Sequence, residues 1–247
     1  MKHISICIPT YEMKGLGAGF LAQSLLVLST QTFTDFDVVV SDHSRTAEIK
    51  DVCDSFSGRV DVSYVSNGEL LGNSAANLNN AIRHATGRLV KILFQDDFLF
   101  SETSLEETAD AFDVSRDGWL ASACEHSSDG KTFYRPFYPR YNDKIHLGKN
   151  TISSPSVVTI RNDRPLLFDE NLLWLMDCDY YRRCHDAFGG PKILNTITVV
   201  NRTGDHQVTE TLATRELRDR ELEYVKQKYG HPESRWSKVR ALASRVI

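Results

Sequence analysis

Short apolar runs rich in β-branched residues alternate with longer segments of helical apolar spacing over the first half of the chain. This alternation predicts parallel strands connected by helices that cover the sheet. A proline follows Ile8 and ends the first strand, because proline cannot donate to the sheet ladder. The expected strands are 4–8, 38–40, 60–65 and 89–94, and the expected helices are 20–28, 47–56 and 74–84, the last with Ser74 as its N-cap.

The second half has a less regular pattern. It predicts a helix at 103–114, strands at 119–123, 157–160 and 193–200, an irregular aromatic and proline-rich segment at 133–141, a helix at 179–188 and a polar helix bearing Leu217, Leu222, Val225 and Tyr229. We therefore expect an α/β fold with a Rossmann-like, mostly parallel central sheet flanked by helices. One domain would span 1–210, and 211–247 would form a C-terminal helical appendage.

Composition narrows the class of protein. The chain has 247 residues, 41% of them hydrophobic, which is enough for a sizeable core. A net charge of −4 gives no overall attraction to nucleic acid, so we expect no nucleic-acid partner. The five cysteines form no CxxC pair, which predicts neither a disulfide framework nor a structural zinc site and favours a reducing, cytoplasmic compartment.

The chain end differs in charge from the body. From residue 211 onward there are nine Lys and Arg against five Asp and Glu, whereas no apolar run is long enough to span a membrane. This basic segment could lie on an anionic membrane at its inner face and hold the protein there peripherally. A solvated helix and an oligomer contact are the alternatives.

Polar residues follow several predicted strands, where open parallel sheets bind ligands. The strongest signal is Asp96 and Asp97, two neighbouring carboxylates directly after the strand 89–94. Such a pair is unfavourable unless it is solvated or neutralised, and a hard divalent cation with oxygen ligands is a natural partner that could in turn hold a diphosphate. The alternative is an ordinary polar turn.

A second carboxylate pair, Asp177 and Asp179, lies too close in sequence to share one helical face. If a helix starts near Asp179, that residue caps it, and Asp177 faces a cleft from the preceding loop. The alternative is that both residues cap the helix. His206 could be a third metal ligand, or a lone surface histidine.

Six segments share one order with a known family. They are the strand and Pro-Thr-Tyr loop at 4–11, the acid-containing strand end at 38–44, the Gly- and Asn-containing helix start at 71–77, the acids at 95–97, the Asp-x-Asp at 177–179 with Arg182 or Arg183, and the Arg- and His-containing element at 202–209. In this order they resemble family 2 of the inverting glycosyltransferases, which have the GT-A fold, over residues 3–210.

The resemblance implies roles for individual residues. Asp177 falls on the catalytic base, while Asp97 and His206 fall on ligands of Mn²⁺ or Mg²⁺. The donor-binding positions are Pro9, Thr10, Tyr11, Glu12, Asp42, Asn73, Asn77, Gln95 and Asp96. The sequence departs from the family at two places, because Gln95 replaces the first acid of the Asp-x-Asp motif and Met176 replaces a Glu.

The activity implied is transfer of a sugar, with inversion, from a nucleotide-diphosphate sugar to a hydroxyl of a glycan or lipid-linked acceptor. A UDP-sugar is the first expectation for the donor, and cell-surface polysaccharide biosynthesis is the expected pathway. Two alternatives stay open. A sugar-nucleotidyltransferase would need a basic, glycine-rich phosphate loop, and 15–19 is glycine-rich with only Lys14 beside it. A non-catalytic nucleotide-sugar or carbohydrate-binding module is the other.

Overall fold

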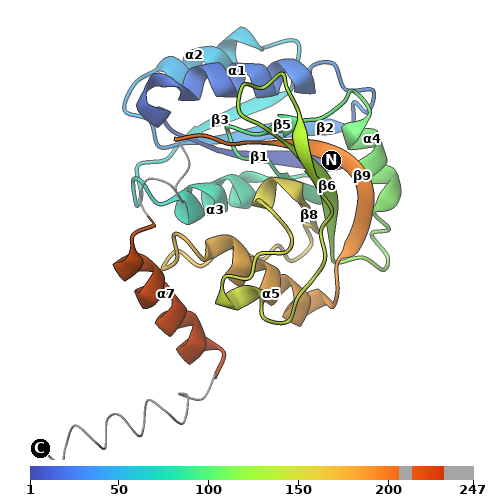
Figure 1. Cartoon of the computed structure of the whole chain (residues 1–247). Coiled ribbons are helices and arrows are strands. Elements are labelled where there is room, and N and C mark those ends of the chain that lie inside the picture. Colours follow the sequence, from blue (N-terminus) through green and yellow to red (C-terminus); the bar gives the residue numbers. More distant parts are fainter. Residues whose placement is uncertain (206–212, 231–247) are drawn as a thin grey trace, which may run out of the picture.

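In a computed structural model of the chain, the structure describes residues 1–205 and 213–230. Within them, nine strands form one sheet in the order β3-β2-β1-β4-β8-β6-β9-β5, with β7 paired to β6 (Figure 1). The strands are β1 (Ile4–Thr10), β2 (Phe36–Asp42), β3 (Val62–Ser66), β4 (Leu89–Ile92), β5 (Phe98–Leu99), β6 (Trp119–Ser127), β7 (Tyr134–Phe137), β8 (Val158–Arg161) and β9 (Lys192–Arg202).

The helices cover both faces of the sheet. They are α1 (Gly17–Leu28), α2 (Glu48–Ser55), α3 (Ser74–His84), α4 (Ser104–Ala111), α5 (Met176–Phe188) and α7 (Arg215–Lys228), with short 3-10 turns at Met13–Gly15, Ile145–Leu147 and Pro155–Val157. Figure 1 shows α1 and α2 on one side of the first strands and α3 on the other. No helix in the described ranges has the length and apolarity needed to cross a membrane.

The first half forms the parallel sheet that the hydrophobic pattern predicts. β1 lies between β2 and β4 and is parallel to both, and β3 continues the parallel order beside β2. All seven residues of β1 are buried, as expected for a strand with helices on both faces. The expectation that Pro9 ends this strand was wrong, because β1 continues to Thr10, with Pro9 opposite Ser41 and Thr10 opposite Asp42. The carboxyl ends of β1 and β2 therefore lie side by side.

The second half makes the sheet mixed. β8 is antiparallel to both β4 and β6, while β9 runs parallel to β6 and antiparallel to β5. The expectation of an irregular segment over 133–141 was wrong in part, because Tyr134–Phe137 pairs with β6 as β7. β7 is short and pairs with β6 through a shifted register, with Cys124 opposite Phe137 and His126 opposite Tyr134, so it has no regular apolar alternation in the sequence.

The N-cap of α3 and the start of α5 differ from the sequence expectation in ways that affect the site. Asn73, and not Ser74, is the N-cap of α3, since its side chain accepts a hydrogen bond from the Ala76 amide. The helix expected from Asp179 begins at Met176, so Asp177 lies in the first turn of α5 and not in the preceding loop.

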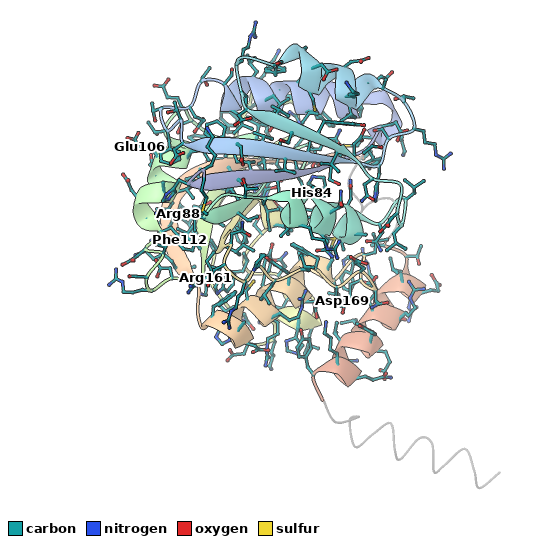
Figure 2. The ribbon with its side chains drawn as sticks, turned by 180° about the vertical axis from the view of Figure 1, so that it is seen from behind. His84, Arg88, Glu106, Phe112, Arg161 and Asp169 are labelled. Carbon is teal, nitrogen blue, oxygen red and sulfur yellow. The ribbon has the colours of Figure 1, made fainter. Side chains whose placement is uncertain are left out.

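The C-terminal helix α7 is tied to the body by buried polar contacts. Lys228 Nζ lies 2.6 Å from a carboxylate oxygen of Asp169 and 2.8 Å from one of Asp179. The Tyr229 hydroxyl donates to Asp179 at 2.7 Å, and the Tyr224 hydroxyl donates to Asp169 at 2.9 Å. Figure 2 shows Asp169 beside this helix. The predicted helix is therefore packed on the rest of the chain, where its polar side chains bind the buried carboxylate of Asp179 and the carboxylate of Asp169.

Candidate functional site

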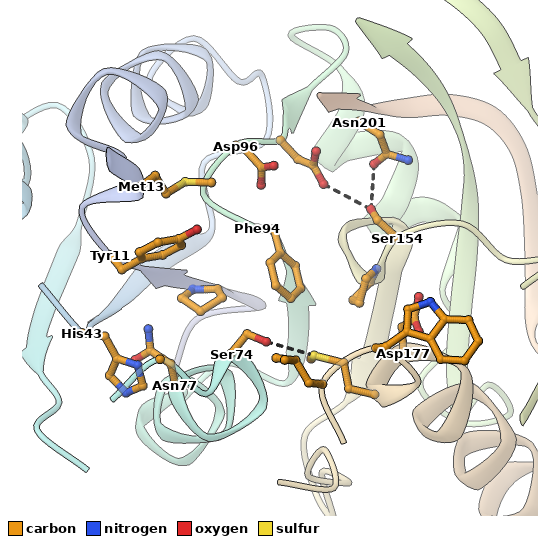
Figure 3. A pocket seen from close by; sticks show the side chains of 17 residues that line it. Tyr11, Met13, His43, Ser74, Asn77, Phe94, Asp96, Ser154, Asp177 and Asn201 are labelled. Atoms are coloured by element: carbon orange, nitrogen blue, oxygen red, sulfur yellow. Dashed lines mark hydrogen bonds between the residues drawn. The ribbon is translucent and has the colours of Figure 1, made fainter. Parts of the chain in front are cut away.

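A cavity of about 360 Å³ opens where β1 and β4 end (Figure 3). One side, which we call the N-terminal wall, consists of Pro9, Tyr11, His43, Asn77 and Asp96. The other side, which we call the C-terminal wall, consists of Ser154, Leu173, Trp174, Met176 and Asp177. Asp97 and Asn201 also line the cavity, so the two carboxylates that the resemblance assigns to the metal and to the base share one space.

The end of β2 is fixed behind the N-terminal wall by Asp42. Its carboxylate accepts hydrogen bonds from the Thr10 hydroxyl (3.1 Å), the Ser44 amide (2.9 Å) and the Tyr64 hydroxyl (2.9 Å). Asp42 is 1% exposed and is not among the residues that line the cavity. Its contacts hold the ends of three neighbouring strands in register, so it supports the wall from behind.

Two buried amides hold the loop that carries Tyr11. The Asn77 side chain donates to the Thr10 carbonyl at 2.9 Å and accepts from the Ser41 hydroxyl at 2.7 Å. Gln95 makes two bonds of 3.0 Å with the Tyr11 backbone, accepting from its amide and donating to its carbonyl. A Cβ at Gly17 would lie 2.1 Å from the same carbonyl, so only glycine permits this close approach. These contacts fix the backbone at Tyr11 while its ring stays 43% exposed.

Asp96 and Asp97 follow β4 but have different surroundings. Asp97 is 4% exposed, accepts from the Arg202 amide at 2.8 Å and lies 3.2 Å from the Ser154 hydroxyl. Burial, and then the charge of Asp96, raise the pKa of Asp97 above its usual range. Asp96 is half-buried at the cavity, and burial together with its charge raises the pKa of the Tyr11 hydroxyl.

A fully buried lysine lies near this pair. Lys91, in β4, donates to the Ser156 carbonyl, and burial lowers its pKa to about 7 while the charge of Asp97 opposes that shift. The charge of Asp97 therefore favours a charged Lys91, and the Arg202 amide donates a hydrogen bond to the same carboxylate. Both carboxylates line the cavity, and Asp96 is the more exposed of the two.

The chemistry of the site fits a cation shared with a substrate. Among residues 1–205 and 213–230, no group of three or more His, Cys, Asp or Glu side chains could hold a metal ion alone. Mg²⁺, however, is commonly bound by one or two carboxylates together with phosphate oxygens of the substrate and water. Asp96 and Asp97 offer such a partial set of ligands at the cavity.

Asp177 lies on the C-terminal wall in the first turn of α5. One carboxylate oxygen accepts from the Cys178 amide at 2.7 Å, and the other accepts from the Asn150 side chain at 2.8 Å. Burial raises the pKa of Asp177 to about 6, although the bonds with Cys178 oppose the shift. A carboxylate with this pKa is deprotonated at neutral pH and is still able to accept a proton, as a general base must.

The structure divides the site residues predicted from sequence into two groups. Those that line the cavity are Pro9, Tyr11, Asn77, Asp96, Asp97 and Asp177. Those that lie outside its lining are Thr10, Glu12, Asp42, Asn73 and Gln95. Glu12 instead accepts from the Arg45 amide, and Asn73 caps α3. His206 lies outside the described residues, so its role as a ligand stays a prediction.

Sequence reasoning missed several residues that line the cavity. Ser154 and Pro155 come from a loop before β8 that has no polar strand-end signal, and Met13 and Phe94 are apolar. Asn201 could have been found, because it begins the polar stretch after the strand predicted at 193–200.

Comparison with known proteins shows the family to which the chain belongs. Residues 5–164 match the family described as Glycosyl transferase family 2, which is more than half of the chain. The chain therefore belongs to glycosyl transferase family 2. No curated protein sequence matches it.

Solved structures share the fold at low sequence identity. S. aureus TarS superposes with a TM-score of 0.63 at 16% identity, covering 95% of this chain and 44% of TarS. A TarS structure in complex with UDP-GlcNAc gives 0.61 at 16% identity, covering 93% of this chain and 73% of the other. Mannosyltransferase PcManGT from Pyrobaculum calidifontis, in complex with GDP-Man and Mn²⁺, gives 0.60 at 17% identity, covering 82% of this chain and 57% of the other. The GT-A fold is thus confirmed, and this chain spans less than half of the longer TarS chain.

Proposed function

We propose that the protein is an inverting glycosyltransferase that moves a sugar from a nucleotide-diphosphate sugar to an acceptor hydroxyl. The observation that carries the proposal is that Asp177, a carboxylate whose pKa is raised to about 6, lines the same cavity as Asp96 and Asp97. Transfer with inversion needs a base on one side of the reacting carbon and a neutralised leaving group on the other. Asp177 on the C-terminal wall would be the base, and Asp96 on the N-terminal wall would help to neutralise the leaving group.

Asp177 would act on the acceptor. Its carboxylate accepts hydrogen bonds from the Cys178 amide and the Asn150 side chain and lines the cavity, where an incoming hydroxyl would approach it. As the acceptor oxygen attacks the anomeric carbon, its proton moves to Asp177. The bond from that carbon to the diphosphate breaks, and its electron pair leaves with the nucleoside diphosphate. Because attack and departure occur on opposite faces, the configuration inverts and no covalent intermediate with the protein forms.

The N-terminal wall would hold the donor. Tyr11 presents an exposed ring beside Pro9, which suits stacking on a base or sugar, and Asp96 faces the same space. A bound Mn²⁺ or Mg²⁺ would neutralise charge on the departing diphosphate. Asp96 and Asp97 would hold it, with His206 as a further ligand. Relatives of the same fold are solved with UDP-GlcNAc and with GDP-Man, which supports a nucleotide sugar, and a UDP-sugar is our first choice.

The C-terminal wall would receive the acceptor. Trp174 lines the cavity on this wall, and an indole face suits stacking against the apolar face of a sugar. We therefore propose a glycan or lipid-linked sugar as acceptor, in the synthesis of a cell-surface polysaccharide. Membrane contact through the basic end of the chain stays a prediction.

The decisive experiment is Asp177→Asn. We expect release of nucleoside diphosphate from the correct donor to fall by about 10²–10⁴-fold, because general-base assistance is lost, whereas binding of the nucleotide itself persists. UDP-GlcNAc and GDP-mannose, each with and without Mn²⁺, are the first donors to test. Asp186→Asn is a matched control, since Asp186 lies on the same helix and its side chain is 44% exposed.

Other outcomes would separate the alternatives. Near-normal turnover of Asp177→Asn would remove Asp177 from the role of base. A wild-type protein that binds nucleotide sugars but releases no nucleotide would be a binding module. Consumption of a nucleoside triphosphate with a sugar phosphate would instead indicate a sugar-nucleotidyltransferase.

A further inference from the structure

A buried carboxylate of α7 contacts the backbone that leads into α5. Glu221 is 2% exposed, and its oxygens accept from three consecutive amides, those of Leu173 (2.8 Å), Trp174 (3.0 Å) and Leu175 (2.8 Å). Leu175 is the N-cap of α5 and provides no side-chain cap. Leu173 and Trp174 precede the helix, so Glu221 satisfies the N-cap amide and the two amides of the segment that leads into α5.

The three amides belong to the C-terminal wall. The side chains of Leu173 and Trp174 line the cavity, and Asp177 follows two residues after Leu175. Arg218 lies three residues before Glu221 on α7, and its guanidinium carbon is 5.3 Å from the Trp174 ring centroid. One face of α7 thus contacts both the backbone and the indole of this wall.

We propose that Glu221 is a positioning residue for the transfer reaction, which fixes the backbone of 173–175 and thereby holds Trp174 and Asp177 at the cavity. A carboxylate that accepts three amides restrains their orientation in a way that a single cap cannot. α7 is in turn fastened to the domain by the contacts of Lys228 and Tyr229 with Asp179. The inference rests on the proposed function only through the role given to Asp177.

Glu221 also contributes to the electrostatic surroundings of Asp177. The titratable groups that interact with Asp177 are Cys178 and Tyr181 on α5 and Glu221 on α7, and the contact from the loop before β8 is the neutral Asn150. The charge of Glu221 raises the pKa of Asp177, although less than burial does. Turnover should fall at low pH as Asp177 becomes protonated, and removing the charge of Glu221 should move this fall to lower pH. A loss of packing alone would not cause such a shift.

The test compares Glu221→Gln with Glu223→Gln. Glu223 is exposed on the same helix and makes one contact with Gln227, so its variant controls for the change of charge. Glutamine keeps the volume of Glu221, but its side-chain NH2 group is a donor. It cannot accept from the backbone amides of 173–175 as the second carboxylate oxygen does. We expect release of nucleotide from UDP-GlcNAc or GDP-mannose, with water as acceptor, to fall by about 10- to 100-fold through misplacement of the base. The affinity for UDP, measured by calorimetry, should be unchanged.

Hydrogen exchange at individual amides gives a readout that does not need activity. In Glu221→Gln, exchange should become faster at 173–177 and stay at the wild-type rate in the parallel strands β1–β4. Wild-type exchange at 173–177 would overturn the proposal, as would loss of protection throughout the chain together with loss of UDP binding. If the wild-type protein released no nucleotide from any donor, the proposed function would fail, and the exchange data would still decide the role of Glu221.

Discussion

The two walls of the cavity are held in different ways. The N-terminal wall is held by Asp42, Asn77 and Gln95. They bond to Thr10 and Tyr11 at the end of β1, which already lies between its neighbours in the parallel sheet. In the C-terminal wall, the backbone before α5 is held by Glu221, which lies 46 to 48 residues further along the chain. The register of the sheet therefore determines one wall, and the docking of a remote helix determines the other.

This difference separates the two tasks of the proposed reaction. The residues that we propose to bind the donor lie on the wall fixed by the sheet, and the proposed base lies on the wall fixed by α7. Changes at distant sites that share no partners usually have independent effects. Substitutions in one wall should thus alter donor binding or proton transfer, but not both.

In the N-terminal wall, the largest effect is expected for Asp96→Asn. Without this charge at the cavity, Mn²⁺ should no longer strengthen UDP binding, and the affinity in its presence should fall by about tenfold or more, which is about 1.4 kcal/mol per factor of ten. Calorimetric titration of UDP with and without Mn²⁺ measures the change. Asp110→Asn, at an exposed position of α4, is the control.

The pH dependence of turnover in Asp96→Asn tests whether the two walls act independently. Its acid limb should coincide with that of the wild type, because Asp96 is not among the groups that shift the pKa of Asp177. A shift of the acid limb would show that the charge of Asp96 affects the pKa of Asp177. Donor binding and proton transfer would then not be independent.

The pH dependence tests the C-terminal wall. The base must be deprotonated to accept a proton, and the pKa of Asp177 is raised to about 6. Turnover should therefore be full above this value and fall as the pH drops through it, to about one tenth at pH 5. Initial rates of nucleotide release between pH 4.5 and 8, with circular dichroism as a check on folding, measure the limb. Constant turnover down to pH 5 would exclude Asp177 as the base.

The same contrast explains what could be predicted from sequence. The parallel strands, and the position of Asp96 and Asp97 after β4, could be predicted because apolar runs and strand ends are local signals. Asp177 is picked out by its pairing with Asp179 and by the order of the family's motifs. The burial of Asp97 could not be predicted, since its partners Ser154 and Arg202 are 57 and 105 residues away. Contacts of this range, like those of Glu221 with residues 173–175, depend on how elements pack, and no single segment encodes them.

The smallest effect on activity is expected for Gln95→Glu, which restores an acid where the family pattern has one. Gln95 both donates to and accepts from the Tyr11 backbone, and a carboxylate can only accept. The variant should therefore lose about 1–3 kcal/mol of unfolding free energy, as a buried carbonyl is left unpaired, with no gain in Mn²⁺ affinity. Urea unfolding measures the loss, and Gln227→Glu, exposed on α7, is the control.

A stable Gln95→Glu protein with tighter Mn²⁺ binding would mean that this side chain can turn into the cavity and serve as a ligand. The N-terminal wall would then be adaptable, and its contrast with the C-terminal wall would disappear. The two reciprocal bonds to one backbone residue argue against such a turn, because breaking them would release the loop that carries Tyr11.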